Sequence, residues 1–243
     1  MRVRLLAAVV GLAGASTALM GVVPAGAGPS GDQGTFCEGV VDVSLLFNKI
    51  EEEPTPKQQD KITGYLDTIE QNAPDEVAEP VGVAVAGVRE GNFDDPAVGA
   101  AIVAVDQWVA DNCGYQVVDV TGRDYEFEGI PRSLETGITL FKFTNEGAEL
   151  HEIALARIKG DESVHELLEL PEEEAEGKVQ PLGSAFASPG QSDFAYVNLK
   201  KAGNYAAVCF IPVGSTDEAA AESAEGPPHA VEGMATDFTV KKG

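Results

Sequence analysis

A single cysteine at the end of a strand-like segment constrains this chain more than any other feature. The segment reads Gly-Asn-Tyr-Ala-Ala-Val-Cys and ends at Cys209. Downstream, His229 precedes Met234 by five positions, and upstream His151 opens another apolar segment. Two imidazoles, one thiolate and a weakly bound thioether are the donor set of a type 1 copper centre. The sequence therefore predicts a metal site built from these four side chains.

The chain has three cysteines, and an odd number in an exported protein needs an explanation. Cys37 lies at the start of the first expected helix and Cys113 at the end of the last one. We expect these two to form a disulfide, which is typical of an oxidising compartment. Cys209 is then left unpaired, either as a metal thiolate or as an inert thiol buried in the core.

The first residues are typical of a targeting segment. Arg2 and Arg4 precede an apolar run that begins at Leu5, and Ala25-Gly-Ala27 provides small residues for cleavage. The sequence thus predicts a signal peptide over residues 1–27, a flexible Gly/Ser-rich leader over 28–35 and a secreted protein. No later run reaches the roughly 18 apolar residues that a membrane-spanning helix needs.

The composition is strongly acidic, with 40 Asp and Glu against 16 Lys and Arg and a net charge of −24. Such a surface repels phosphate backbones and anionic lipids. We therefore expect no nucleic-acid partner and no membrane insertion. A basic redox protein, or a basic copper donor or acceptor, is the kind of partner that this charge favours.

Residues 36–114 show the periodicity of four helices. Pro56, Pro74 and Pro96 each stand near the start of a helical segment, where proline is tolerated. Apolar residues recur at three- and four-residue spacing in each segment, and Gly114 is a suitable stop after the last one. The sequence predicts a small four-helix bundle, linked by the disulfide and without chemistry of its own.

After Gly114 the periodicity changes from that of helices to that of strands. Short segments alternate apolar and polar residues and are separated by Gly, Pro, Asn and Asp, which is typical of a β-sandwich. Expected strands cover residues 117–120, 125–127, 137–144, 151–158, 192–199, 204–210 and 236–240. One helical insert begins with Asp161 as its N-cap and ends at Pro171, and an acidic solvated run follows it.

Three segments of residues 115–243 resemble the cupredoxin family, which includes the blue copper proteins plastocyanin and azurin. The segment from Asn145 to His151 resembles the loop that ends in the family's first copper histidine. The segment ending at Cys209 matches the family's G-x-Y-x-x-x-C strand. His229-x4-Met234 matches the second histidine and the axial methionine, with a last strand after them.

The resemblance implies a Greek-key β-sandwich that holds one type 1 copper ion. His151, Cys209 and His229 would form the trigonal plane, and Met234 would be axial. The family's role implies electron transfer or copper handling. We expect no enzyme, since the chain has no G-x-S-x-G, H-E-x-x-H, P-loop or Rossmann motif.

Two departures from the family pattern bear on this interpretation. Residues 210–228 separate Cys209 from His229, a longer loop than the family has, although loop-closure cost grows only logarithmically with length. Glu152 follows the first histidine, where the family often has asparagine. The alternative is a metal-free cupredoxin-like module, in which Cys209 packs as core and the acidic loop binds an extracellular partner.

Overall fold

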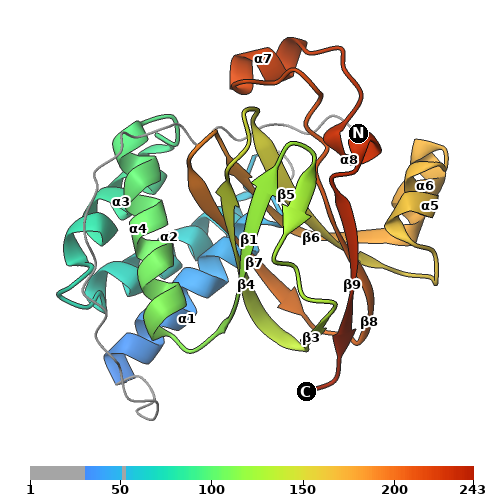
Figure 1. Cartoon of the computed structure of the whole chain (residues 1–243). Coiled ribbons are helices and arrows are strands. Elements are labelled where there is room, and N and C mark those ends of the chain that lie inside the picture. Colours follow the sequence, from blue (N-terminus) through green and yellow to red (C-terminus); the bar gives the residue numbers. More distant parts are fainter. Residues whose placement is uncertain (1–30, 51–52) are drawn as a thin grey trace. The chain divides into compact units, whose positions relative to one another are not determined.

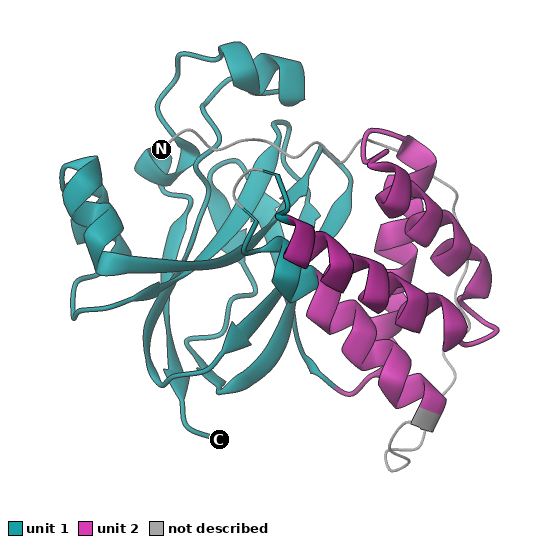
Figure 2. Cartoon of the chain, turned by 180° about the vertical axis from the view of Figure 1, so that it is seen from behind, with its two compact units in different colours: residues 1–7, 44–55, 115–243 teal, residues 8–43, 56–114 magenta. Residues whose placement is uncertain are grey.

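The computed structural model describes residues 31–50 and 53–243, so the signal peptide expected over 1–27 lies outside the described residues. The described chain divides into two compact units (Figure 2). One contains residues 31–43 and 56–114, and the other contains residues 44–50, 53–55 and 115–243. Among the helices of these ranges, none is long and apolar enough to cross a membrane.

The helices α1 (Gly31–Phe47), α2 (Pro56–Gln71), α3 (Ala78–Glu90) and α4 (Pro96–Asn112) account for the predicted bundle. Residues 31–35 are the first turns of α1 rather than part of a flexible leader. Asp95 caps α4 by accepting a hydrogen bond from the amide of Ala97, and Pro96 follows it at the first helical position. The apolar faces of the helices bury Phe36, Val40, Ile62, Leu66, Val81, Val85, Val98, Val105 and Val109.

A disulfide joins Cys37 to Cys113, as predicted. The two residues are 76 positions apart, so the bond connects the beginning of the helical unit to its end. Near it, the Phe36 and Trp108 rings meet edge to face with their centroids 5.4 Å apart. Trp108 is therefore part of the packing of the bundle.

The second unit is a sandwich of two β-sheets (Figure 1). The first sheet has the order β2-β1-β4-β7, with β1 and β4 parallel, and the second has the order β3-β9-β8-β5-β6, with β3 and β9 parallel. The strands are β1 (Gln116–Arg123), β2 (Glu126–Glu128), β3 (Ser133–Glu135), β4 (Gly137–Asn145), β5 (His151–Ile158), β6 (Val179–Ala187), β7 (Ser192–Leu199), β8 (Gly203–Val208) and β9 (Ala235–Lys241). The predicted arrangement, a helical unit followed by a β-sandwich, is confirmed.

Alternation along β8 separates two apolar layers. Tyr205, Ala207 and Cys209 join the main core between the sheets. Ala206 and Val208 face the other way and pack in a smaller cluster. That cluster also contains Val164 and Leu167 of α5 (Val164–Leu168), which covers the outer face of the second sheet. The face predicted for Cys209 is thus confirmed, and the thiol lies inside the sandwich.

Some elements differ from the sequence prediction. β3 and β6 were not expected, and β6 is the edge strand next to β5. The helical insert is capped by Ser163, in a reciprocal capping box with Glu166, rather than by Asp161. The acidic run after it is helix α6 (Glu172–Lys178), which has no buried residue. Two short helices, α7 (Glu218–Ser223) and α8 (His229–Glu232), lie between β8 and β9.

Candidate metal centre

The long segment between Cys209 and His229 is closed at its base. Pro212 and Pro228 form an isolated antiparallel bridge, and the amide of Val213 donates to the carbonyl of Pro227 at 2.9 Å. The amide of His229 donates to the carbonyl of Ile211 at 2.8 Å. Residues 213–227 therefore protrude as a lobe from a short, hydrogen-bonded base. His229 returns next to Cys209 despite the length of the intervening chain.

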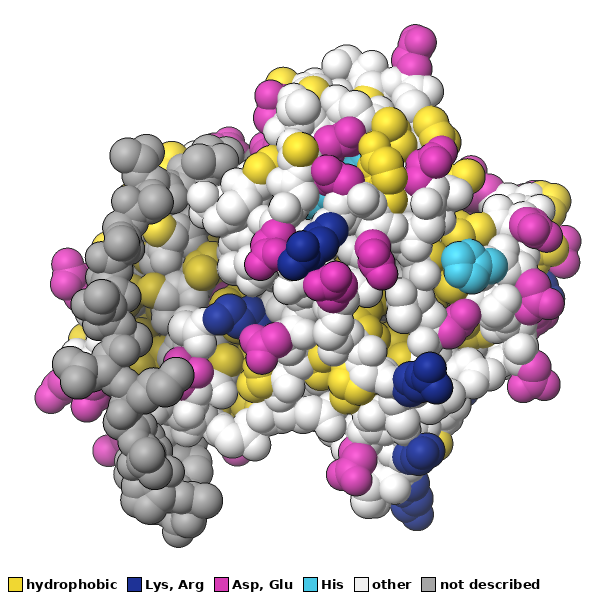
Figure 3. Space-filling view, in the orientation of Figure 1, with side chains coloured by type: hydrophobic (Ala, Val, Ile, Leu, Met, Phe, Trp, Pro, Cys, Tyr) yellow, Lys and Arg dark blue, Asp and Glu magenta, His cyan; other side chains and the backbone are white. Residues whose placement is uncertain are grey.

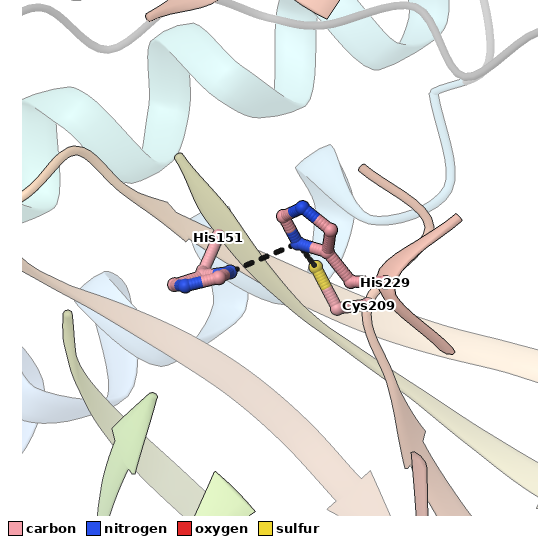
Figure 4. A group of neighbouring side chains, drawn as sticks. All are labelled: His151, Cys209 and His229. Carbon is pink, nitrogen blue, oxygen red and sulfur yellow. Dashed lines mark hydrogen bonds between the residues drawn. The ribbon is translucent and has the colours of Figure 1, made fainter. Parts of the chain in front are cut away.

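Three predicted donors converge at one end of the sandwich (Figure 4). His151 is the first residue of β5, Cys209 follows β8, and His229 begins α8. The Nδ1 atoms of the two histidines are 3.0 Å apart, and Cys209 Sγ lies 3.4 Å from His229 Nδ1. All three donor atoms lie within 4.8 Å of one another, and all three residues are 0% exposed.

Each imidazole has a carboxylate on its other nitrogen. His151 Nε2 is 2.8 Å from Asp124 Oδ1, and His229 Nε2 is 3.0 Å from Glu149 Oε2. Burial opposes ionisation of both acids, but hydrogen bonds outweigh it and hold both pKa values below their usual range. For Asp124 these bonds come from the amide of Ala148 and from His151; for Glu149 they come mainly from Gly214 and His229.

Ionised carboxylates only accept hydrogen bonds, so both Nε2 atoms must carry the ring hydrogen. An imidazole that carries its hydrogen on Nε2 presents a lone pair on Nδ1 when the ring is neutral. Burial lowers the pKa of His151 and so disfavours a second ring proton there. Two nitrogen lone pairs consequently face each other 3.0 Å apart, and the Cys209 thiol is the one group among the three that can donate, to His229 Nδ1. A cation is what such an arrangement accommodates.

The spacing suits a transition-metal ion. Three donors placed evenly around an ion at its usual bond lengths would be about 3.5–4 Å apart. The observed separations of 3.0 and 3.4 Å are slightly shorter, so a small outward movement of the donors would complete the site. Two nitrogens and one sulfur are the trigonal set of a blue copper centre. The buried cluster fits one type 1 copper ion.

Met234, predicted as the axial ligand, lies in the same core cluster as Cys209 and is 0% exposed. Its amide donates to the carbonyl of His229, and its carbonyl accepts from the amide of Cys209, both at 3.0 Å. These backbone bonds fix Met234 beside two of the donors. A buried thioether there suits the weak axial position.

The cysteine is held from the other side by Glu152. The amide of Glu152 donates to Cys209 Sγ at 3.3 Å. Burial raises the pKa of Cys209 to about 12, so the metal-free protein holds a thiol, whereas a bound cation would favour the thiolate. Burial also raises the pKa of Glu152 to about 8, and its Oε2 atom has no hydrogen-bond partner among the described residues. Glu152 is thus a neutral acid beside the cysteine.

Three residues around the site were not predicted from the sequence. Asp124 lies between β1 and β2, and Glu149 lies two residues before His151. The Tyr125 ring lies 4.8 Å from the His229 ring, and its hydroxyl donates to Glu149 Oε1 at 3.2 Å. An acidic residue close to a candidate ligand is the one signal that could have pointed to Glu149, but 40 acidic residues made that signal weak.

No protein-family model and no curated protein matches this chain. Solved structures similar to it include three auracyanins, each covering about half of the chain. Auracyanin B is 17% identical over 52% of this chain and 88% of its own, with a TM-score of 0.35. The auracyanin of Roseiflexus castenholzii is 18% identical over 52% of this chain and 97% of its own, with a TM-score of 0.35. Auracyanin A of Chloroflexus aurantiacus, described as a "blue" copper protein, is 16% identical over 53% of this chain and 100% of its own, with a TM-score of 0.34.

A multicopper oxidase, McoA of Aquifex aeolicus, is also similar: 14% identity, 53% of this chain and 30% of that one, with a TM-score of 0.29. Identities and TM-scores this low carry no argument about ligands or chemistry. The interpretation of the site rests on the donor geometry and on the carboxylates behind it.

Proposed function

We propose that this protein is an exported copper protein that binds one copper ion through His151, Cys209 and His229, with Met234 axial, and that it carries electrons or handles copper. The convergence of two Nδ1 lone pairs and one sulfur carries this proposal. Copper bound to such a set supplies one-electron redox chemistry. Residues 1–27, with their basic start and A-x-A end, support export.

The chain's own residues would give such a site rigidity. His151 is the first residue of β5 and Cys209 directly follows β8, and these two strands are hydrogen-bonded neighbours that pair from Ala154 to Arg157 of β5. Glu152 and Met234 tie the cysteine from both sides through the backbone. Donors fixed in this way change position little when the charge at the site changes, which is what one-electron exchange requires.

The charge of the surface supports a basic partner. Acidic side chains are spread over the face seen in Figure 3, and around α7 and α8 they surround apolar ones. In α8, Val231 is 60% exposed and Glu232 follows it. Complementary charge speeds encounter between proteins more than it tightens the complex. A basic redox protein or a basic copper donor or acceptor would fit this surface.

The second candidate is a metal-free interaction module. It is favoured by one observation: burial, with a smaller contribution from the nearby Glu152 and Glu149, raises the pKa of Cys209 to about 12, as expected for an inert core thiol. The facing lone pairs of His151 and His229 argue against it, because without a cation or an additional proton they repel.

The test is to add Cu(II) to the metal-free, signal-free protein and record the visible spectrum. We expect one equivalent of copper to produce an intense thiolate-to-copper band, and Cys209→Ser to lose the band. His165→Ala is the matched control, because His165 is exposed on α5 and lies outside the cluster. A wild-type protein that remains colourless, with Cys209 still a free thiol, would overturn the proposal and favour the interaction module.

A further inference from the structure

The carboxylates behind both histidines concentrate negative charge at this site. Asp124 and Glu149 come from different loops and reach different rings, with Nε2-to-oxygen distances of 2.8 and 3.0 Å. Neither imidazole edge is open to solvent, since both histidines are 0% exposed. Hydrogen bonds between a ligating histidine and a carboxylate orient the ring and make it a stronger base.

Both carboxylates are held in place by other groups. Asp124 accepts from the amide of Ala148 through both oxygens, each at 3.1 Å. A Cβ atom at Gly147 would collide with Asp124 Oδ1 and would lie 2.6 Å from His151 Nε2. Glycine at this position therefore allows Asp124 and His151 to approach each other. These contacts hold the Asp124 carboxylate in one position beside His151.

Glu149 is fixed even more extensively. Its Oε2 atom accepts from the amides of Gly214 at 2.6 Å and Ser215 at 3.2 Å, in addition to His229. Its Oε1 atom accepts from the Tyr125 hydroxyl at 3.2 Å. Four donors around one carboxylate stabilise its ionised form and keep it pointed at the His229 ring.

We propose that Asp124 and Glu149 are positioning residues whose two negative charges make the site favour an oxidised, divalent ion over a reduced, monovalent one, an inference that rests on the copper site proposed above. With the Cys209 thiolate they place three negative charges around one ion. A divalent ion leaves a net charge of −1 and a monovalent ion leaves −2, so each carboxylate favours the divalent state. The site would bind Cu(II) tightly and have a low reduction potential.

The charge can be removed while the hydrogen bond is kept. Asp124→Asn and Glu149→Gln retain an oxygen that accepts from Nε2, but both are neutral. Glu146→Gln is the matched control, because Glu146 is an exposed carboxylate in the same loop that pairs with Arg123 rather than with either histidine. Affinities for Cu(II), Cu(I) and redox-inert Zn(II) are measured by competition with chelators, starting from metal-free protein.

Each neutral variant should lose about 10- to 100-fold in Cu(II) and Zn(II) affinity, as is usual when a carboxylate behind a metal-binding histidine is altered. Cu(I) affinity should fall less, and each tenfold difference between the two oxidation states raises the reduction potential by about 59 mV. The thiolate-to-copper band should persist, since all four ligands remain. Glu146→Gln should leave both the affinities and the potential unchanged.

Three outcomes would decide against the inference. Equal losses of Cu(II) and Cu(I) affinity, with an unmoved potential and an intact band, would show that the carboxylates only shape the site. A shift as large in Glu146→Gln would show a general charge effect. A wild-type protein without the band would overturn the copper site and this inference together. The described hydrogen bonds of Asp124 go to Ala148, His151 and Glu149 rather than to the lobe, so Asp124→Asn tests the charge even where Glu149→Gln loosens the lobe.

Discussion

At the scale of single residues, burial opposes the ionisation of the side chains at the site. Burial raises the pKa of the Cys209 thiol to about 12 and lowers the pKa of His151, so a dry site opposes both the thiolate and the imidazolium. The same burial brings two nitrogen lone pairs within 3.0 Å. A bound cation relieves both effects, because it favours the thiolate and occupies the space between the lone pairs. A bound cation therefore stabilises the site relative to its metal-free form.

Asp193 provides a pH test of the sandwich away from the site. Burial raises the pKa of Asp193 from its usual value of 3.8 to about 6, although its Oδ2 atom accepts from the amide of Phe186 at 2.9 Å. Between these pH values the folded state keeps a proton that the unfolded state releases. The free energy of unfolding should therefore fall as pH rises through this window, by at most about 3 kcal/mol.

Asp193→Asn keeps an acceptor for Phe186 and removes the titration, so its unfolding free energy should lack this fall. The measurement is urea denaturation of metal-free protein at pH 4.5 and 7. Unfolding is monitored by the reactivity of the Cys209 thiol. That thiol is buried and is the unpaired cysteine of the described chain, so it reports on the sandwich. Equal pH slopes in wild type and variant would rule out the assignment to Asp193.

The convergence of His151, Cys209 and His229 could be predicted because each proposed ligand lies in a local pattern, such as a strand followed by cysteine or a histidine shortly before a methionine. Their carboxylate partners could not. Asp124 is 27 positions from His151, and Glu149 is 80 positions from His229. Such contacts are produced by the packing of loops at one end of the sandwich. No periodicity or spacing within a single segment encodes them.

Among the elements, the lobe between Cys209 and His229 matters most for the site. Its length was the main departure from the resemblance, yet the Pro212–Pro228 bridge closes its base. The two prolines mark this base in the sequence, but their pairing depends on backbone contacts across the loop. Ser215 is 0% exposed, and its carbonyl accepts from the amide of Leu150 at 2.6 Å, so the lobe is also tied to the start of β5.

The base of the lobe, rather than its tip, should hold His229 in place. Replacing residues 217–225, which include α7, by two glycines leaves every base hydrogen bond in place. We expect Cu(II) affinity within about threefold of wild type, because sites without shared partners act independently. The sandwich should lose about 1 kcal/mol of stability, since Ala221 of α7 packs into its core.

Val213→Pro is the contrasting variant. It removes the amide that donates to Pro227 at the base and keeps the tip complete. We expect it to weaken Cu(II) binding by more than tenfold and to broaden the visible band, because His229 is no longer held in one position. Competition titration and the spectrum measure both effects. A tip replacement that weakens binding as much as Val213→Pro would show that α7 supports the site directly.

For the chain as a whole, the change from helical to strand periodicity at Gly114 predicted a helical unit followed by a β-sheet unit. The odd number of cysteines, together with the places of Cys37 and Cys113, predicted that Cys209 is the free thiol. The sequence did not indicate that residues 44–50 and 53–55 group with the sandwich. Asn48 is in this segment, and its Nδ2 atom donates to the carbonyl of Tyr196 at 2.8 Å. A single side-chain hydrogen bond to a distant backbone leaves no periodic trace, so sequence patterns place such a segment with its neighbours in the chain.

The disulfide and the metal centre should be energetically separate, because all four proposed ligands lie in the sandwich unit and both disulfide cysteines lie in the helical unit. A Cys37→Ser/Cys113→Ser variant should lower the stability of the helical unit by about 4–5 kcal/mol, the loop-closure value for so long a separation. The lone Trp108 reports on that unit by fluorescence in urea. The copper band and the protection of the Cys209 thiol should remain as in wild type, and their joint loss would mean that the units fold as one cooperative body.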